Sequence, residues 1–239
     1  GKGEHEALAE LRALAEQNTA HRYRTFIGEG FYGCVAPSVI TRNVLEDPSW
    51  YTPYTPYQAE VAQGRLEAML AYQTVVSDLT GLPVATCSLL DEGTAAAEAM
   101  RMCVAHKHGA GAVGRGATIA VASTLHRHVI DVVRTRAAPL GVRVVEVDPR
   151  TFDPAALPGF VGLIAGYPNT LGTVDDLRPV ADRVHRAGGL FVCDCDLLAL
   201  TLLREPAAFG ADVVVGTSAR LGCGMGFGGA HAAFLATSD

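Results

Sequence analysis

The feature that most constrains the fold is an alternation of short apolar segments with longer helical patterns, from about residue 83 to residue 235. The apolar segments are continuous and rich in β-branched residues, as strands buried on both faces are. Strands that alternate with such helices form a mostly parallel sheet with helices on both faces, so we expect an α/β protein. The expected strands are 83–88, 117–122, 142–147, 161–165, 190–193, 213–215 and 232–235, and the helices among them are 94–106, 126–136 and 176–187.

The amino-terminal third has a different pattern. Glycines and prolines interrupt residues 25–57, and Gly81 ends the longest helical pattern. We therefore expect an amino-terminal helix and an arm over residues 1–57, and a large domain, in part, over residues 58–239. The helices expected before residue 83 are 5–17, 38–47 with Ser38 as its cap, and 58–80.

Composition excludes several classes of function. The 239 residues are 49% hydrophobic and carry a formal net charge of -6, so nothing attracts nucleic acid. We expect no membrane span and no secretion signal, hence a cytoplasmic or organelle-matrix protein. The six cysteines lie in apolar stretches, as reduced cysteines do. Cys193 and Cys195 share one face of a strand and supply two ligands at most, so no metal site is expected.

The loop before the helix 94–106 is the first candidate site. Ligands of open parallel sheets bind at the carboxyl ends of the strands. Glu92, Gly93 and Thr94 stand where a helix begins, and the free N–H groups there suit a phosphate. The alternative is that Asp91 and Thr94 only cap the helix, and the carboxylates of Asp91 and Glu92 would repel an anion.

Two other segments are candidate walls of a cleft. Arg220 precedes a glycine-rich loop, 222–229, in which Gly228 and Gly229 allow close approach of a ligand or another chain. The alternative there is a tight turn. The segment 50–60 contains Trp50 and three tyrosines stiffened by prolines, and suits a cleft or an interface as well as a loop packed on its own domain. Those tyrosines are Tyr51, Tyr54 and Tyr57.

Single polar residues near strand ends are weaker candidates. His126 follows a strand and could stack on a ligand or cap a helix. Asp194 and Asp196 end another strand, where a carboxylate serves a ligand or caps a helix expected over 197–203.

Several blocks of the sequence resemble one family. YTPYTPYQ at 51–58, QGRLEA at 63–68 and SLLDEGTAAAEA at 88–99 are similar to the signature region of the glycine cleavage system P-protein. The likeness extends over nearly the whole chain and is to the amino-terminal half of that protein. The chain departs from the expected pattern near its glycine-rich loop, at Ala219, Gly224 and Ala230.

The resemblance implies a fold and a cofactor. P-proteins are fold-type I enzymes that use pyridoxal phosphate (PLP) to decarboxylate glycine, and they pass the aminomethyl group to the lipoyl arm of H-protein. The expected fold is the large domain of a fold-type I PLP-dependent transferase, with the small carboxyl-terminal domain apparently absent. The segment expected at the Schiff-base lysine holds Ser218, Ala219 and Arg220.

The number and position of the lysines determine whether such a chain could bind PLP covalently. The sequence holds only Lys2, near the amino terminus, and Lys107, at the end of a helix. We therefore expect a lysine-bearing partner subunit, or a homo-oligomer, to hold PLP covalently. This chain would line the cleft with Tyr51, Tyr54, Tyr57 and Arg220. It would approach the cofactor with Glu92, Gly93, Thr94, His126, Gly228 and Gly229. The alternatives are a non-catalytic scaffold or regulatory subunit, and a diverged PLP enzyme that acts on another amino acid, without covalent attachment or through Lys107.

Overall fold

A computed structural model describes residues 1–24, 26–226 and 229–238, and it contains two compact units, residues 1–31 and 32–239. Within residues 1–24 and 26–31 the smaller unit has one α-helix, α1 (Glu4–Glu16), in which no residue is buried, and one 3-10 turn, Ala20–Arg22. Leu8, Leu11 and Leu14 are exposed on it. The boundary expected after residue 57 stays a prediction. None of the described helices is long and apolar enough to cross a membrane.

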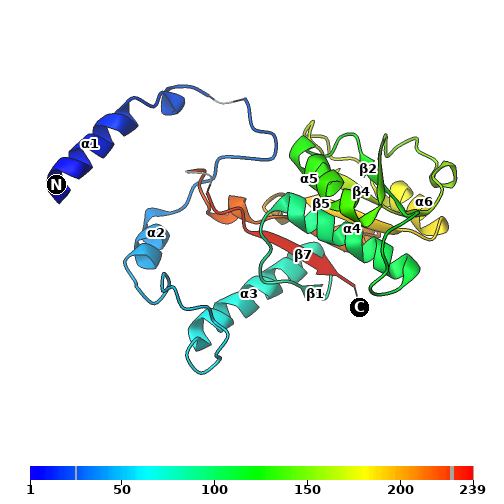
Figure 1. Ribbon diagram of the computed structural model, residues 1–239, viewed down its shortest axis with the longest axis horizontal. Helices are drawn as coiled ribbons and strands as arrows, with labels where there is room; N and C mark the ends of the chain where they lie inside the picture. The colour runs from blue at the N-terminus through cyan, green and yellow to red at the C-terminus, as the bar shows by residue number, and fades with distance from the viewer. Residues whose placement is uncertain (25, 227–228, 239) are drawn as a thin grey trace. The chain divides into compact units, whose positions relative to one another are not determined.

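The larger unit is built on a seven-stranded sheet in the order β1-β7-β6-β5-β4-β2-β3. Figure 1 labels five of these strands, β1, β2, β4, β5 and β7. The neighbouring strands β6, β5, β4, β2 and β3 are all parallel to one another. On the other side of β6, β7 pairs antiparallel with β6, and β1 pairs antiparallel with β7. The mostly parallel α/β sheet expected from the sequence is therefore confirmed. The strands are β1 (Val84–Ala85), β2 (Thr118–Ala122), β3 (Arg143–Val147), β4 (Phe160–Tyr167), β5 (Leu190–Cys195), β6 (Val213–Thr217) and β7 (Ala233–Thr237).

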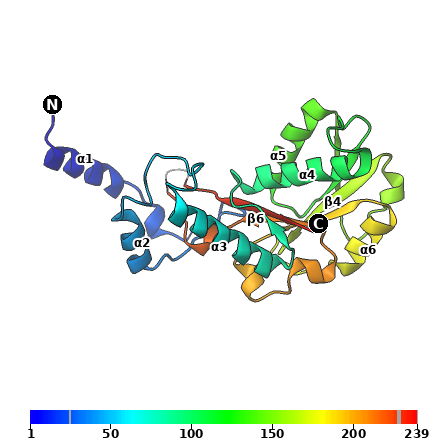
Figure 2. The ribbon, with the colours of Figure 1, turned by 90° about the horizontal axis from the view of Figure 1, so that it is seen from below.

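Helices cover both faces of this sheet (Figure 2). One face packs against α4 (Glu92–His108) and α5 (Arg127–Ala137) in a buried cluster that includes Ile119, Ile164 and Val192. The other face packs against α6 (Arg178–Arg186), with part of α3 (Gln63–Thr80). Because both faces are covered, β2 and the first six residues of β4 are buried throughout, which is why their sequences are continuously apolar.

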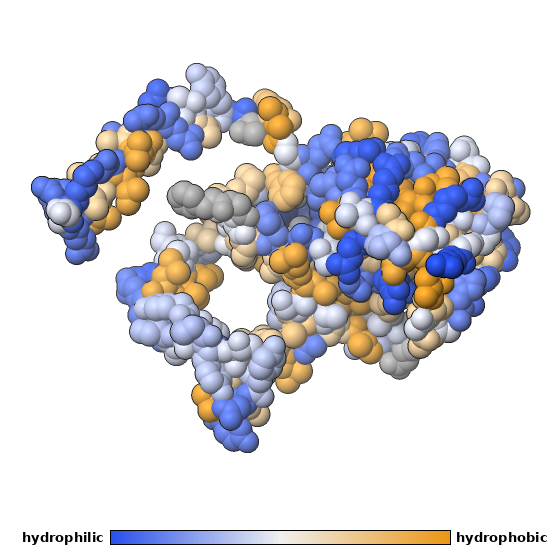
Figure 3. Space-filling model, viewed as in Figure 1, coloured by the Kyte–Doolittle hydropathy of each residue, from blue (hydrophilic) through white to orange (hydrophobic). Residues whose placement is uncertain are grey.

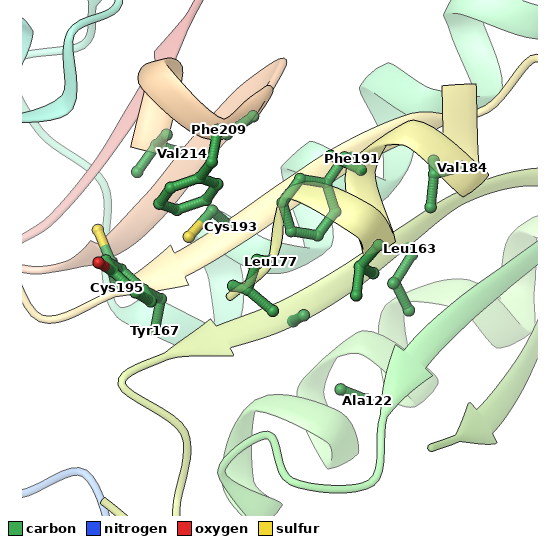
Figure 4. Close-up of a cluster of buried hydrophobic side chains, with 14 of the residues drawn as sticks. Ala122, Leu163, Tyr167, Leu177, Val184, Phe191, Cys193, Cys195, Phe209 and Val214 are labelled. Carbon is green, nitrogen blue, oxygen red and sulfur yellow. The ribbon is translucent and has the colours of Figure 1, made fainter. Parts of the chain in front are cut away.

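The core on the α6 face is the more aromatic of the two. Phe191, Leu163 and Val184 point toward one another between the strands and α6 (Figure 4). Cys193 and Cys195 point into the same cluster, because residues two apart on a strand share a face. Asp194, between them, consequently faces α4, and this places a carboxyl group at the edge described below.

Four local expectations are wrong. The helix expected over 58–80 begins at Gln63, and the strand expected over 83–88 is reduced to β1. Residues 197–203 form only the short 3-10 turn Ala199–Thr201 instead of a helix. Ser38 is the first residue of α2 (Ser38–Leu45) rather than its cap, because Pro37 occupies the cap position. The errors at Gln63 and Ser38 concern the first residue of a helix, which sequence patterns place least reliably. The other two concern short segments, where local patterns discriminate poorly between helix, strand and turn.

The segment from Tyr32 to Val61, which precedes α3, is called the arm below, and it buries few of its side chains. No residue from 33 to 61 is buried, although α2 lies within it. Apolar side chains of the chain are visible at the surface in Figure 3, shown in orange. Within the arm the exposed ones include Val35, Ile40, Leu45 and Trp50. Exposed apolar residues gathered on one segment are typical of a surface that another protein covers.

Candidate site at the carboxyl edge of the sheet

Polar side chains gather where the parallel strands end. His126 follows β2 as the cap residue of α5, and Thr170 follows β4. Asp194 is the next-to-last residue of the strand β5, Asp196 follows that strand, and Arg220 follows β6. The carboxyl ends of parallel strands lie at one edge of the sheet, where α/β proteins bind their ligands. The sheet therefore collects residues far apart in the sequence into one neighbourhood.

The first turn of α4 is a capped helix start. Asp91 accepts a hydrogen bond from the Thr94 N–H at 2.7 Å, so the capping interpretation of this loop is confirmed. Gly93 has a packing reason as well, because a Cβ there would lie 2.9 Å from Val132 of α5. The part that Glu92, Gly93 and Thr94 would play in binding a cofactor stays a prediction.

Two buried carboxyl groups meet beside this turn. Glu92 is 8% exposed and Asp194 only 3%, and neither oxygen of Asp194 receives a hydrogen bond from a donor in the described part of the chain. Burial raises the pKa of Asp194 well above its ordinary value, and the neighbouring Glu92 carboxyl raises it further. His128 Nε2 lies 3.1 Å from Glu92 Oε2. The Asp194 carboxyl therefore keeps its proton to a higher pH than an exposed aspartate does.

The imidazole of His126 is fixed from two sides. Its Nδ1 lies 3.0 Å from Thr170 Oγ1. Its ring stacks on His128, with centroids 5.7 Å apart and planes 13° apart. Since His128 reaches Glu92, the predicted residues His126 and Glu92 belong to one connected group.

Arg220 joins this group through an aromatic side chain of the arm. Its guanidinium forms an ion pair with Asp196 and lies over the ring of Tyr32, 5.3 Å from the ring centroid. The Tyr32 ring in turn meets His126 edge-on, with centroids 6.4 Å apart. Asp196 also accepts the Leu198 N–H at 3.1 Å, so it caps a turn as well as binding Arg220. Arg220, His126 and Glu92 are therefore brought together, with Tyr32 and His128 between them.

The arm tyrosines lie in a different setting. Tyr51 and Tyr57 are 57% and 92% exposed, and Tyr54 is 40% exposed. Arg65 donates to the Tyr54 carbonyl at 2.5 Å, which joins this part of the arm to α3. A groove of about 500 Å³ is lined by Trp50, Val61 and residues of α3 that include Arg65, and none of the three tyrosines is among its lining residues. The three tyrosines stay predicted wall residues of a shared cleft.

The glycine-rich loop is described only in part. Gly228 lies outside the described residues, and Gly229 adopts φ +50°, a conformation that favours glycine. Its N–H donates to the Gly226 carbonyl at 2.7 Å, as in a tight turn. Near the start of the loop, Tyr72 of α3 donates to Ser218 at 3.0 Å. Burial raises the pKa of Tyr72. The approach of Gly228 and Gly229 to a cofactor stays a prediction.

The residues at this edge do not fit PLP as a cofactor of this chain alone. The cofactor needs a lysine amine for its aldehyde and hydrogen-bond donors for its phosphate. Lys107 donates to the Gly188 carbonyl at 3.1 Å, and it lies roughly 22 Å along α4 from Glu92, at 1.5 Å per residue. The first turn of α4 carries the acidic residue Glu92, and the Asp194 carboxyl of β5 lies next to it, where an anion would need positive charge.

No three His, Cys, Asp or Glu side chains gather as a metal site in residues 1–24, 26–226 and 229–238. The expectation that the chain needs no metal stays a prediction. All six cysteines are free; Cys103, Cys193 and Cys195 are buried, whereas Cys223 is exposed.

Three residues of this site were missed at the sequence level: Tyr32, His128 and Thr170. The spacing of His126 and His128 was available as a signal, because it brings two imidazoles into one helical turn. Tyr32 gave no such signal, since it lies in an irregular segment far from Arg220 in sequence.

The family comparison covers the whole chain. A sequence model described as "Glycine cleavage system P-protein" matches residues 1–239. The glycine dehydrogenase (decarboxylating) of Akkermansia muciniphila is 52% identical over 239 residues, all of this chain and 24% of that protein. The mitochondrial glycine dehydrogenase (decarboxylating) of Dictyostelium discoideum is 48% identical over 237 residues, 99% of this chain and 23% of that protein. The chain thus spans about a quarter of the length of these relatives.

Solved structures agree with this result. A glycine decarboxylase (P-protein) of the glycine cleavage system, crystallised in inhibitor-bound form, superposes with a TM-score of 0.85 at 34% identity. The match covers 100% of this chain and 53% of that one. Mouse CSAD superposes over 100% of this chain and 55% of its own with a TM-score of 0.70 at 19% identity, which indicates the shared fold alone.

Proposed function

Because this chain belongs to the glycine cleavage system P-protein family, we propose that it is a component of a PLP-dependent glycine decarboxylase that does not itself supply the Schiff-base lysine. The family is PLP-dependent, and the fold is that of fold-type I enzymes. In this proposal another chain or segment carries the lysine that holds PLP, whose ring accepts the electrons left when CO₂ departs. H-protein would accept the remaining aminomethyl group.

The position of Lys107 is the observation that carries the proposal. Lys107 ends α4 at the exposed face beside Gly188, whereas the carboxyl edge of the sheet lies at the start of that helix. Lys2 lies in the smaller unit and pairs with Glu10. An independent PLP enzyme that used Lys107 would need this side chain beside Asp91 and Thr94, which is the other end of α4.

The contribution we propose for this chain is a wall of the shared site. Tyr51, Tyr54 and Tyr57 would line the cleft, with Arg220 as a carboxylate or phosphate contact. Because Arg220 already pairs with Asp196, an anion must compete with that carboxylate. Glu92, Gly93, Thr94 and His126 would lie near the cofactor of the partner, together with Gly228 and Gly229.

The test is covalent trapping. Incubation of the purified chain with PLP, reduction with borohydride and intact mass measurement should return the unmodified mass, with Lys107→Arg as a control. A stoichiometric adduct on Lys107 would instead make this chain an independent PLP enzyme. The same experiment with a lysine-bearing P-protein chain should place the adduct on that chain, and glycine decarboxylation should require both chains.

The second candidate function is a non-catalytic scaffold. The exposed apolar residues of the arm favour a scaffold as much as they favour a shared active site. A scaffold would stabilise the catalytic partner without touching substrate. Tyr54→Phe and Arg220→Met in the assembled complex separate the two proposals. If the site is shared, kcat/KM falls while the complex still forms, whereas a scaffold leaves kcat/KM unchanged.

A further inference from the structure

One aromatic ring of the chain itself occupies the ligand edge of the sheet. Tyr32 lies between the guanidinium of Arg220, 5.3 Å from its ring centroid, and the imidazole of His126, at 6.4 Å between centroids. Arg220 follows β6 and His126 follows β2, so the two contacts come from well-separated strands. In α/β proteins this edge of the sheet binds a ligand. In this chain it holds the Tyr32 side chain, from the start of the arm.

The Arg220 side of this slot is held in place independently of Tyr32. Asp196 binds the guanidinium, and the Asp196 carboxyl is fixed by the Leu198 N–H at 3.1 Å. Asp196 is 13% exposed as a side chain and Arg220 32%, so water screens this pair only in part. A guanidinium held edge-on by a carboxylate presents its flat face, the geometry in which arginine stacks on an aromatic ring.

The His126 side is equally fixed. Thr170 lies 3.0 Å from its Nδ1, and His128 stacks on the ring and reaches Glu92 at 3.1 Å. The guanidinium of Arg220 and the imidazole of His126 are therefore each held by contacts that do not involve Tyr32.

The arm needs an attachment that apolar burial does not supply. Residues 33–61 contain no buried residue, and the first buried one after them is Ala62, 2% exposed, which immediately precedes α3. The far end of the arm is therefore tied down at Ala62 and by Arg65, which donates to the Tyr54 carbonyl. At the near end Tyr32 supplies ring contacts to the body.

We propose that Tyr32 is the resident occupant of the slot between Arg220 and His126, and that it anchors the arm to the sheet. The slot then serves as an attachment point within the chain instead of as a site for a free ring-shaped ligand. This agrees with the misfit between the edge and PLP described above. Tyr32 acts as a positioning residue, and its use in presenting Tyr51, Tyr54 and Tyr57 to a second chain rests on the proposed function.

Nuclear magnetic resonance on the purified chain tests the anchor without any partner. In the wild-type protein we expect backbone order parameters near about 0.8 for residues 33–36, and ring-current shifts on the side-chain signals of Arg220 and His126. Tyr32→Ala should lower the order parameters below about 0.6 and remove those shifts. Tyr32→Phe keeps the ring and should behave like the wild type.

Tyr57→Ala is the matched control, because it removes a tyrosine of the same arm that is 92% exposed. It should leave the signals of Arg220 and His126 unchanged. The anchor is refuted if residues 33–36 are as ordered in Tyr32→Ala as in the wild type, or if they are already mobile in the wild type. It is also refuted if Tyr32→Phe behaves like Tyr32→Ala. Because Tyr32 is 44% exposed, the alanine variant should keep its core, which unfolding of the same sample verifies. None of these outcomes depends on whether the chain takes part in glycine decarboxylation.

Discussion

At the scale of single residues, the candidate site contains a buried pair of carboxyl groups that should cost stability. Asp194 lacks a hydrogen-bond donor in the described part of the chain and faces Glu92 in the interior. A carboxyl group in such surroundings disfavours its charged form, so it keeps a proton that the unfolded chain would release. Folding therefore binds a proton here, and stability depends on pH.

Asp194→Asn should stabilise the protein, and the gain should grow with pH. The unfolded carboxyl ionises near its ordinary pKa of 3.8, whereas the raised pKa in the folded state delays ionisation. The wild type thus loses stability as pH rises above that value, and asparagine, which does not titrate, does not. We expect little difference near about pH 4 and a gain of roughly 1–3 kcal/mol at neutral pH, the range for an unsatisfied buried polar group.

Denaturant unfolding of both proteins across that pH range measures the gain. Asp182→Asn, an exposed carboxylate on α6, is the control and should change stability little at any pH. A loss of stability in Asp194→Asn at neutral pH would show that the aspartate is ionised and paired in the folded protein.

The sequence could place some of these residues but not their neighbours. That Asp194 and Asp196 end a strand followed from the apolar run before them, and the cap at Asp91 followed from the helix start. The meeting of Asp194 with Glu92 depends on which face of β5 turns toward α4, and hence on the register of the whole sheet. Sequence patterns do not fix that register across separate strands.

At the scale of elements, α4 and α5 are packed so closely that their contact depends on Gly93. A Cβ at Gly93 would lie 2.9 Å from both Cβ and Cγ2 of Val132. Gly93→Ala should therefore destabilise the protein by about 1–3 kcal/mol through overpacking, although alanine is the better helix former. Thermal unfolding of Gly93→Ala, alone and combined with Val132→Ala, checks this.

The double variant should recover part of the lost stability, because Val132→Ala removes the close Cγ1 and Cγ2 atoms and leaves only the Cβ. Gly64→Ala on α3 is the matched control, since nothing lies within 4 Å of a Cβ there. It should be neutral or slightly stabilising. If Gly93→Ala were also neutral, the packing explanation for this glycine would be wrong.

The long elements were predictable and the short ones were not. The strands β2 to β6 and the helices α4 to α6 were found because their patterns extend over whole elements. β1 is only two residues long, and it owes its existence to pairing with β7, a contact that no local pattern encodes. The turn at 199–201 likewise kept apolar residues at helical spacing without forming an α-helix.

At the scale of the whole molecule, the arm provides a natural reporter of association. Trp50 is the only tryptophan, is 47% exposed and lines the groove beside α3. If a lysine-bearing chain covers the arm, water leaves the indole and its fluorescence emission should shift to shorter wavelength on mixing. A titration followed by fluorescence, with complex formation verified by sedimentation, measures this shift. Trp50→Phe is the blank, and an unchanged spectrum in a complex that does form would place the interface elsewhere.

The position of β7 determines when the sheet can be completed during synthesis. β1 bonds only to β7 among the named strands, with Val84 opposite Thr237. A ribosome adds about 5–20 residues per second, so β1 waits about 8–30 s for its partner to be translated. Near the end of that time β6 has been translated too, and its outer edge stays open until β7 follows; open edges pair readily with other chains. A nascent chain that stalls before residue 233 therefore exposes an unpaired strand edge, and it is at that stage of translation that a chaperone would be most useful.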